Sequence, residues 1–232
     1  MPDLRLSISD FNLNSEQTRR FVLYAAELVE WNTRMNISAI RTVDEIWSKH
    51  FCDSLSLLTM FKDEFPKSWI DVGTGGGFPG IPIKIMRPEI ELTLVDSVGK
   101  KIDFCRNVLN LIGLKANVLT ARAEDLGQDL VYREKYDCSC ARAVAALPIL
   151  CELLLPLTKV GGYMLVQKGS SAHEEINQAE RALLVLGGAL ENIEKIHING
   201  VKEDRFLIKI RKIKSTPIQY PRRVGMPSKR PL

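Results

Sequence analysis

The stretch from Ser68 to Pro82 constrains the fold of this chain more than any other part of the sequence. Its first residues, S-W-I-D-V, are mostly apolar and predict a short buried strand, which the glycine-rich run G-T-G-G-G-F-P-G follows at once. Glycine readily adopts positive φ angles and lets the backbone approach a ligand closely. The residues that follow, 81–86, predict a helix, and a helix N-terminus presents free N–H groups. A strand, a glycine turn and a helix in this order indicate the start of an α/β nucleotide site.

Several interpretations of the glycine-rich run are open from these residues alone. The pattern G-x-G-x-x-G from Gly75 to Gly80 fits the dinucleotide fingerprint. The same stretch reads D-x-G-x-G-x-G from Asp71 to Gly77, which resembles motif I of the class I S-adenosylmethionine (SAM) methyltransferases. A tight turn with a purely structural purpose is the third interpretation. The rest of the chain has to distinguish them.

Strands and helices alternate after the glycine loop, which predicts a mostly parallel sheet with helices on both faces. The next strand covers residues 90–95, ends in Asp96 and leads into a helix over 98–112. Later strands are predicted over 116–120, 136–140, 163–167, 190–198 and 206–213, with helices over 146–157 and 174–186. Because the last two strands are consecutive, we expect seven strands with an antiparallel strand at the edge.

A helical extension precedes this core. One helix is predicted over residues 15–35, with Asn14 as its cap, and a second over residues 42–60. We expect one structural domain, which consists of the extension (1–66), the core (67–216) and a basic tail (217–232).

Polar residues follow the predicted parallel strands at their carboxyl ends, where open α/β sheets bind ligands. They are Asp71 with Gly73, Asp96, Ala123 with Glu124, Arg142, and Lys168. The position of Asp96 suits a carboxylate that accepts hydrogen bonds from ribose hydroxyls. NAD and SAM sites share such a carboxylate. Five such positions on one rim are the main evidence, from the residues themselves, for a binding site.

Basic residues are concentrated at the C-terminal end of the chain. Residues 205–232 hold nine Lys or Arg and no Asp or Glu, whereas residues 1–204 hold 23 basic and 28 acidic residues. This asymmetry favours a polyanionic partner. A solvated tail that only aids solubility is the alternative.

Composition excludes other classes of protein. No apolar run reaches the roughly 18 residues of a membrane span, and the N-terminus lacks the apolar segment of a signal peptide. We therefore expect a cytoplasmic protein. The five cysteines lie in apolar segments and are predicted to be reduced core residues. With three histidines and no second cysteine pair, we expect no metal site.

Motifs over nearly the whole chain resemble one bacterial enzyme family. They are N-I-S-A-I-R (36–41), H-F-C-D-S-L (50–55), D-V-G-T-G-G-G-F-P-G-I-P (71–82), L-V-D-S (94–97), R-A-E (122–124), R-A-V-A (142–145), V-Q-K-G (166–169) and Y-P-R-R (220–223) with G-M-P-S-K-R-P-L (225–232). They resemble the 16S ribosomal RNA guanine-N7 methyltransferases, also called the glucose-inhibited division protein B family. One mild departure is Gly76, where many relatives carry another small residue or proline.

This resemblance implies a Rossmann-like class I methyltransferase fold with S-adenosyl-L-methionine as the cofactor. The positions it implies on the cofactor side are Asp71, Gly73, Gly75, Phe78, Asp96, Ala123, Glu124 and Arg142. Within this set Asp71 would bind the methionine end and Asp96 the ribose, and Ala123 with Glu124 would flank the adenine. Arg142 would lie on the rim of the cofactor site.

The same resemblance implies 16S ribosomal RNA of the small ribosomal subunit as the partner, with no membrane and no metal, for an enzyme expected to be a monomer. The positions implied on the RNA side are Lys100, Lys168, Arg222, Arg223, Lys229 and Arg230. Guanine N7 carries a lone pair and no proton, so its methylation needs no general base. His50 and Asp53 are the predicted catalytic residues, since a carboxylate would stabilise the cationic product.

Three other functions stay open from the sequence. An NAD(P)-dependent oxidoreductase would explain the glycine pattern, but no separate substrate domain or Tyr-x-x-x-Lys pair accompanies it. A non-catalytic RNA-binding module with a nucleotide fold is less consistent with Gly73, Asp96 and Glu124. A small-molecule methyltransferase is less consistent with the basic tail.

Overall fold

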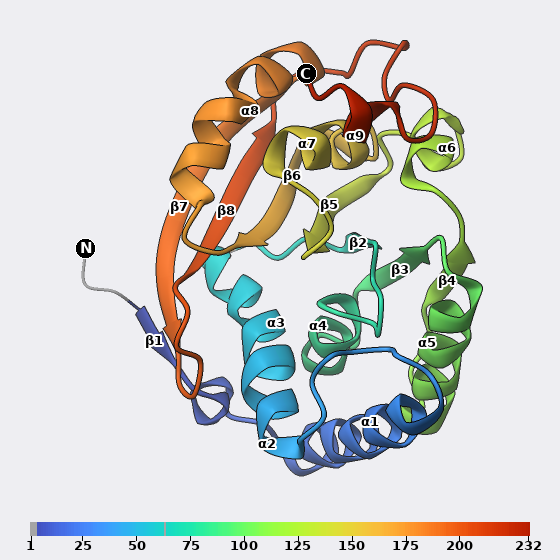
Figure 1. The fold of residues 1–232 in the computed structure, drawn as a ribbon, viewed down its shortest axis with the longest axis vertical. Helices are drawn as coiled ribbons and strands as arrows, with labels where there is room; N and C mark the ends of the chain where they lie inside the picture. Colours follow the sequence, from blue (N-terminus) through green and yellow to red (C-terminus); the bar gives the residue numbers. More distant parts are fainter. Residues whose placement is uncertain (1–3, 63) are drawn as a thin grey trace.

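An eight-stranded sheet forms the centre of the computed structural model, which describes residues 4–62 and 64–232 (Figure 1). The strands lie in the order β1-β7-β8-β6-β5-β2-β3-β4. They are β1 (Leu4–Leu6), β2 (Ser68–Val72), β3 (Glu91–Asp96), β4 (Asn117–Thr120), β5 (Tyr136–Arg142), β6 (Thr158–Lys168), β7 (Gly188–Ile198) and β8 (Arg205–Lys212). Neighbouring strands are parallel except where β8 pairs with β6 and with β7.

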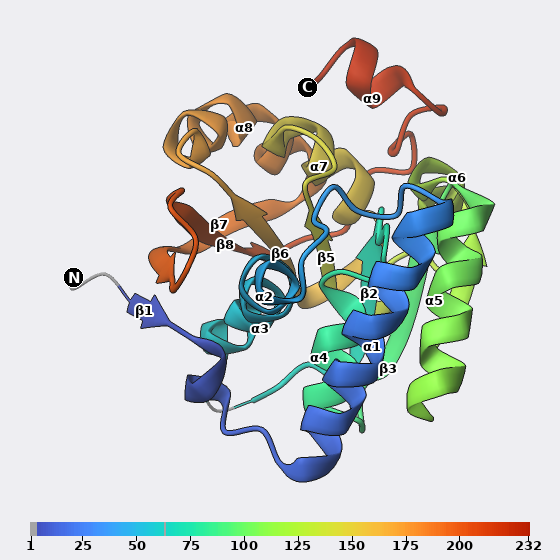
Figure 2. The same cartoon turned by 60° about the horizontal axis from the view of Figure 1, so that its bottom comes forward.

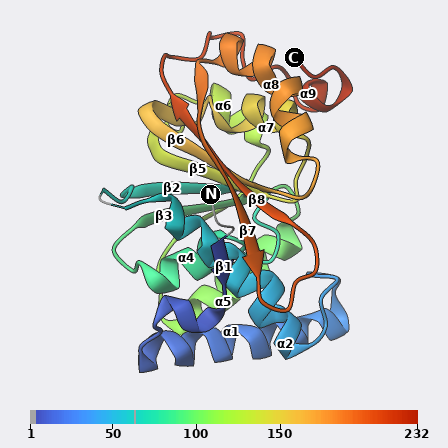
Figure 3. The same ribbon diagram turned by 90° about the vertical axis from the view of Figure 1, so that its left-hand side faces the viewer.

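The predicted Rossmann-like fold is confirmed, with one strand more than the seven expected. The additional strand, β1, pairs in parallel with β7, where Leu4 lies opposite Ile196 (Figure 3). It has three residues, of which only Leu6 is buried, so the sequence offers no alternating pattern to detect. Because β7 and β1 lie outside it, the antiparallel strand β8 is third from the edge of the sheet.

Helices cover both faces of the sheet (Figures 1 and 2). They are α1 (Ser15–Arg34), α4 (Gly80–Met86), α5 (Gly99–Ile112), α6 (Ala123–Gln128), α7 (Leu147–Leu154), α8 (Ala172–Leu186) and α9 (Met226–Lys229). The first three share one apolar core, and α6, α7 and α8 share the core on the opposite face. Across the described residues, no helix combines the length and apolar character needed to cross a membrane.

The second predicted helix of the extension is a helical run with a wide turn in its middle. It consists of α2 (Val43–Glu45), a π-helix (Ile46–Cys52), α3 (Asp53–Leu55) and a 3₁₀ turn (Ser56–Met60). Single π turns inside helices are frequent at functional sites. His50 lies within this turn and Asp53 directly follows it, so both side chains belong to the irregular part of the run.

The extension is part of the hydrophobic core. Asn14 and Gln17 exchange the hydrogen bonds of the predicted capping box at the start of α1. Phe21, Tyr24 and Leu28 recur on one face of α1 and have no exposed surface.

The five cysteines are free and buried, as predicted.

The basic C-terminal segment packs against α6 and α7. The buried Arg133 donates a hydrogen bond of 2.7 Å to the main-chain oxygen of Thr216. Arg222 binds the carboxylate of Glu152 through its Nε (2.8 Å) and Nη2 (2.5 Å), and Glu152 is only 1% exposed. Arg222, which was predicted to contact RNA, thus neutralises a buried acid in this structure.

We expect Arg222→Met to lower the free energy of unfolding by roughly 3 kcal/mol, because it leaves the Glu152 carboxylate buried without its partner. Arg223→Met is the matched control, since its side chain is exposed and its loss should change stability by less than about 0.5 kcal/mol. Urea unfolding of both variants makes the comparison. Equal losses would show that the Arg222–Glu152 pair does not fasten the segment.

Candidate functional site

Asp71 holds the glycine loop from beneath. Its Oδ2 accepts hydrogen bonds from Thr74 Oγ1 (2.6 Å) and from the N–H of Gly80 (2.9 Å), so one carboxylate joins both ends of the loop. Asp71 has no exposed surface, and burial raises its pKa to about 6. Asp71, which was predicted to bind the methionine end of the cofactor, thus holds the backbone of the loop in place.

Asp96 fixes the open side of the same loop. Its carboxylate accepts hydrogen bonds from the N–H groups of Gly75 (3.0 Å) and Val98 (2.9 Å). Gly73 and Gly75 have φ angles of 69° and 58°, values that favour glycine. A Cβ on Gly75 would meet only the main-chain oxygen of Gly73, at 3.9 Å. This face of the loop is thus free for a ligand, beside the carboxylate predicted to bind ribose.

The ring of Phe78 links the glycine loop to the N-terminal extension. It lies between Tyr24, at a centroid distance of 5.3 Å, and His50, at 4.2 Å, and both ring pairs are within 11° of parallel. The hydroxyl of Tyr24 also donates a hydrogen bond to the main-chain oxygen of Gly76. Because Phe78 is only 5% exposed, its ring positions the loop more than it can cover a ligand.

Two exposed valines beside the loop escaped the sequence prediction. Val98 follows Asp96 and is 45% exposed, and Val144 follows Arg142 and is 38% exposed. A Cβ on Gly73 would lie 2.6 Å from a methyl carbon of Val144, so this side chain rests on the loop. Both valines lie two residues beyond strand ends that were recognised, which is the signal that could have found them.

α6 lies at the next strand end and contacts the C-terminal segment. Ala123 is buried at its start, and the carboxylate of Glu124 accepts a hydrogen bond of 2.9 Å from the N–H of Gly225. The C-terminal segment therefore touches a residue predicted to flank the cofactor. This contact joins the C-terminal segment to α6.

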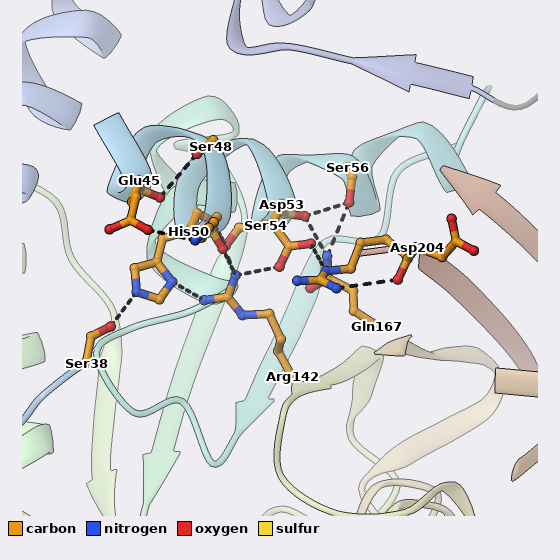
Figure 4. A network of polar contacts seen from close by, with 12 residues as sticks. Ser38, Glu45, Ser48, His50, Asp53, Ser54, Ser56, Arg142, Gln167 and Asp204 are labelled. Atoms are coloured by element: carbon orange, nitrogen blue, oxygen red, sulfur yellow. Dashed lines mark hydrogen bonds and ion pairs between the residues drawn. The ribbon is translucent and has the colours of Figure 1, made fainter. Parts of the chain in front are cut away.

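Arg142 joins His50 and Asp53 in one polar network (Figure 4). Its Nη1 lies 2.8 Å from Asp53 Oδ2 and its Nη2 lies 2.9 Å from His50 Nδ1. The guanidinium also lies over the ring of Phe78, 5.0 Å from its centroid. The structure thus brings three predicted residues together, from the end of β5 and from the helical run of the extension.

His50 is held as the neutral imidazole. Arginine can only donate, so His50 Nδ1 is the acceptor and its proton is on Nε2, which donates to Ser38 Oγ over 2.6 Å. Burial, with the charge of Arg142, lowers the His50 pKa to about 3. Asp53 is 4% exposed, and its carboxylate is paired with Arg142.

A cavity of about 420 Å³ opens beside this network, within the range of small-molecule pockets. We name it the rim cavity; it is lined by Lys49, His50, Asp53, Arg142, Ala143, Gln167, Lys168, Gly169 and Arg205. Four of these residues are basic. Lys168, predicted to face RNA, binds Glu175 at 2.8 Å and the main-chain oxygen of Ala145.

The other residues predicted to bind RNA lie on the surface. Lys100 is exposed in the first turn of α5, after Asp96. Arg223, Lys229 and Arg230 are exposed on the C-terminal segment. Because Gly225 touches Glu124, this segment borders the strand ends described above.

Comparison with known proteins identifies a family. The sequence model of the GidB family, described as rRNA small subunit methyltransferase G, matches residues 17–207. A relative from Desulfitobacterium hafniense is 45% identical over 96% of this chain and 92% of its own. One from Lactobacillus acidophilus is 42% identical over 99% and 97%. Both are named ribosomal RNA small subunit methyltransferase G.

Solved structures share the fold at low identity. A SAM-dependent methyltransferase from Aquifex aeolicus is 16% identical, with a TM-score of 0.52, over 68% of this chain and 89% of that chain. P. horikoshii TYW2 in complex with MeSAdo is 14% identical, with a TM-score of 0.55, over 72% and 63%.

The lowered pKa of His50 predicts a pH-dependent stability. This pKa lies below that of a histidine in the unfolded chain, about 6.5. The contribution of neutral His50 to the free energy of unfolding is therefore complete above pH 6.5 and is lost as the pH falls toward 3. Between pH 6.5 and 5 the loss should reach about 2 kcal/mol. The raised pKa of Asp71 acts in the opposite direction, with stability gained as the pH falls through 6. Therefore the difference between wild type and His50→Gln is the quantity to measure.

Urea unfolding at several pH values tests this: the stability advantage of wild type over His50→Gln should shrink as the pH falls. His173→Gln removes an exposed imidazole from α8 and is the matched control. A constant advantage from pH 7 to 5 would mean that His50 is not held neutral.

Proposed function

Because the chain belongs to the GidB family of small-subunit ribosomal RNA methyltransferases, we propose that it transfers the methyl group of SAM to N7 of a guanine in the decoding-region loop of 16S ribosomal RNA. The chain is a SAM-dependent RNA methyltransferase, and we infer that it works as a cytoplasmic monomer. The observation that carries the proposal is the contact of Phe78 with His50 and Arg142, which joins the glycine loop to the rim cavity.

The groups left available around the glycine loop fit SAM. The loop is open at Gly75, the Asp96 carboxylate lies beside it, and the exposed Val98 offers an apolar surface for an adenine ring. Asp96 would hold the ribose, and Val98 with Ala123 would flank the adenine. Gly73 would let the backbone approach the methionine end, with Asp71 fixing the loop from below.

SAM, when bound, supplies a methyl group on a sulfonium that becomes a neutral thioether. The protein needs no base for this reaction, since guanine N7 carries no proton. This agrees with the network, in which His50 stays neutral because burial lowers its pKa to about 3. The contribution of the network is to hold guanine N7 in line with the methyl group, and such positioning can lower the activation barrier by roughly 7–11 kcal/mol. We assign His50 as a positioning residue, and Asp53 orients Arg142.

The basic surface would bind the RNA backbone. Lys100, Arg223, Lys229 and Arg230 border the strand ends and are exposed. Contacts of this kind release counterions, so RNA affinity should fall steeply as salt rises. Arg222 is left out of this set because it binds Glu152.

The proposed reaction is tested by transfer of a labelled methyl group from SAM to small ribosomal subunits, naked 16S ribosomal RNA or a mixture of small molecules. We expect label in RNA, released as 7-methylguanine. The preferred RNA acceptor shows whether a loop sequence or an assembled particle is recognised. Label only in small molecules would overturn the RNA substrate, and RNA binding without SAM binding would indicate a non-catalytic module.

Gly73→Ala tests the cofactor site itself. Gly73 and Gly113 have φ angles of 69° and 68°, so alanine at either position should cost about 1 kcal/mol of stability. A Cβ on Gly73 also meets Val144, whereas nothing lies within 4 Å of one on Gly113. We therefore expect Gly73→Ala to weaken SAM binding at least tenfold in calorimetry, and Gly113→Ala to leave it unchanged. Equal affinities would place the cofactor elsewhere.

A further inference from the structure

The basic residues that line the rim cavity already have acceptors. Lys49 lies 2.7 Å from Glu45, and Lys168 lies 2.8 Å from Glu175. Arg142 donates to Asp53 and to His50, as described above. These three side chains therefore have close acceptors within the protein, and Arg205 is the fourth cation of the wall.

Two acceptors on the same wall make no hydrogen bond within the protein. Asp53 Oδ1 and Gln167 Oε1 are buried and make no hydrogen bond, and they are two of only four such side-chain atoms among the described residues. The orientation of Gln167 is fixed, since its Nε2 donates to the main-chain oxygen of Asp53 (2.5 Å) and to Ser56 Oγ (3.2 Å). Unpaired buried acceptors are rare in folded proteins and call for a specific explanation.

We propose that these two oxygens, Asp53 Oδ1 and Gln167 Oε1, accept hydrogen bonds from the Watson–Crick edge of the target guanine. This proposal rests on the proposed function and names the residues that choose the base. Guanine presents two neighbouring donors on that edge, N1–H and the N2 amino group. Adenine presents an acceptor at N1, and hypoxanthine lacks the N2 amino group. Enzymes that act on an extruded base commonly read it by this edge.

The chemistry of methylation is compatible with this orientation. N7 lies on the Hoogsteen edge, on the other side of the purine, so it stays free when the Watson–Crick edge is bound. The Arg142 and His50 side chains connect the cavity wall to Phe78 and hence to the glycine loop. A base held at Asp53 and Gln167 is thus placed next to the cofactor rim.

Arg205 controls access to Asp53. Its Nε lies 3.5 Å from Asp53 Oδ1, and its Nη1 lies 3.4 Å from the main-chain oxygen of Asp204. Both contacts are long, and the Arg205 side chain is 25% exposed. In our proposal the entering nucleotide displaces Arg205, which then pairs with the phosphate while the base reaches the carboxylate.

Direct binding of four probes tests the proposal without RNA or methyl transfer: guanosine, inosine and adenosine 5′-monophosphates and ribose 5-phosphate. Saturation-transfer NMR gives affinities, and the imidazole signal of His50, one of three histidines, reports the site. We expect guanosine monophosphate to bind roughly tenfold or more tightly than the other three and to shift the His50 signal. Equal affinities, or no saturable guanosine monophosphate binding, would overturn the proposal.

Gln167→Met removes one acceptor and should reduce the preference for the guanine nucleotide over inosine monophosphate by at least fivefold. Gln178→Met makes the same change on the exposed surface of α8 and should keep the wild-type preference. SAM affinity should be unchanged in both variants. Loss of RNA methylation with intact guanine selectivity would reject the proposed reaction alone, whereas methylation with no base preference would reject this inference alone.

Discussion

The stacked contact of Phe78 with Tyr24 and His50 is the interaction on which the site depends. A glycine-rich loop has little stiffness of its own, because glycine has the widest conformational freedom of any residue. Here one aromatic ring of that loop is enclosed by rings from the extension on both sides. Asp71 secures the same loop from the sheet. The glycine loop is therefore positioned by residues that come before it in the chain.

The irregular second helix of the extension supplies one side of the same contact. The π turn over Ile46–Cys52 carries His50 toward Phe78, and Asp53 follows it directly. Both side chains then meet Arg142 from the end of β5 (Figure 4). The segment from Ile46 to Asp53 thus supports the glycine loop through His50 and lines the rim cavity with Asp53.

What the sequence could predict follows from how local each signal is. Asp71, Asp96 and the glycines lie within or directly after short apolar runs, so their place at strand ends was visible. Their partners were not: the bonds of Arg222 with Glu152, and of Gln167 with Asp53, join residues that are distant in sequence. The composition of the C-terminal segment likewise suggested a free basic tail, because the contacts of this segment with Glu152 and Glu124 also join residues that are distant in sequence. Charge is countable in a sequence, but pairing depends on the fold.

Strand β1 has a consequence for the order in which the molecule assembles. Its residues 4–6 pair with residues 196–198, so the two partners are nearly the full chain apart. Contacts of such sequence separation are slow to form, since a long loop must close before they contribute. During vectorial synthesis the first strand emerges from the ribosome long before β7 exists. The edge of the sheet is therefore the last part to close, and until then β7 is open to pairing with another chain.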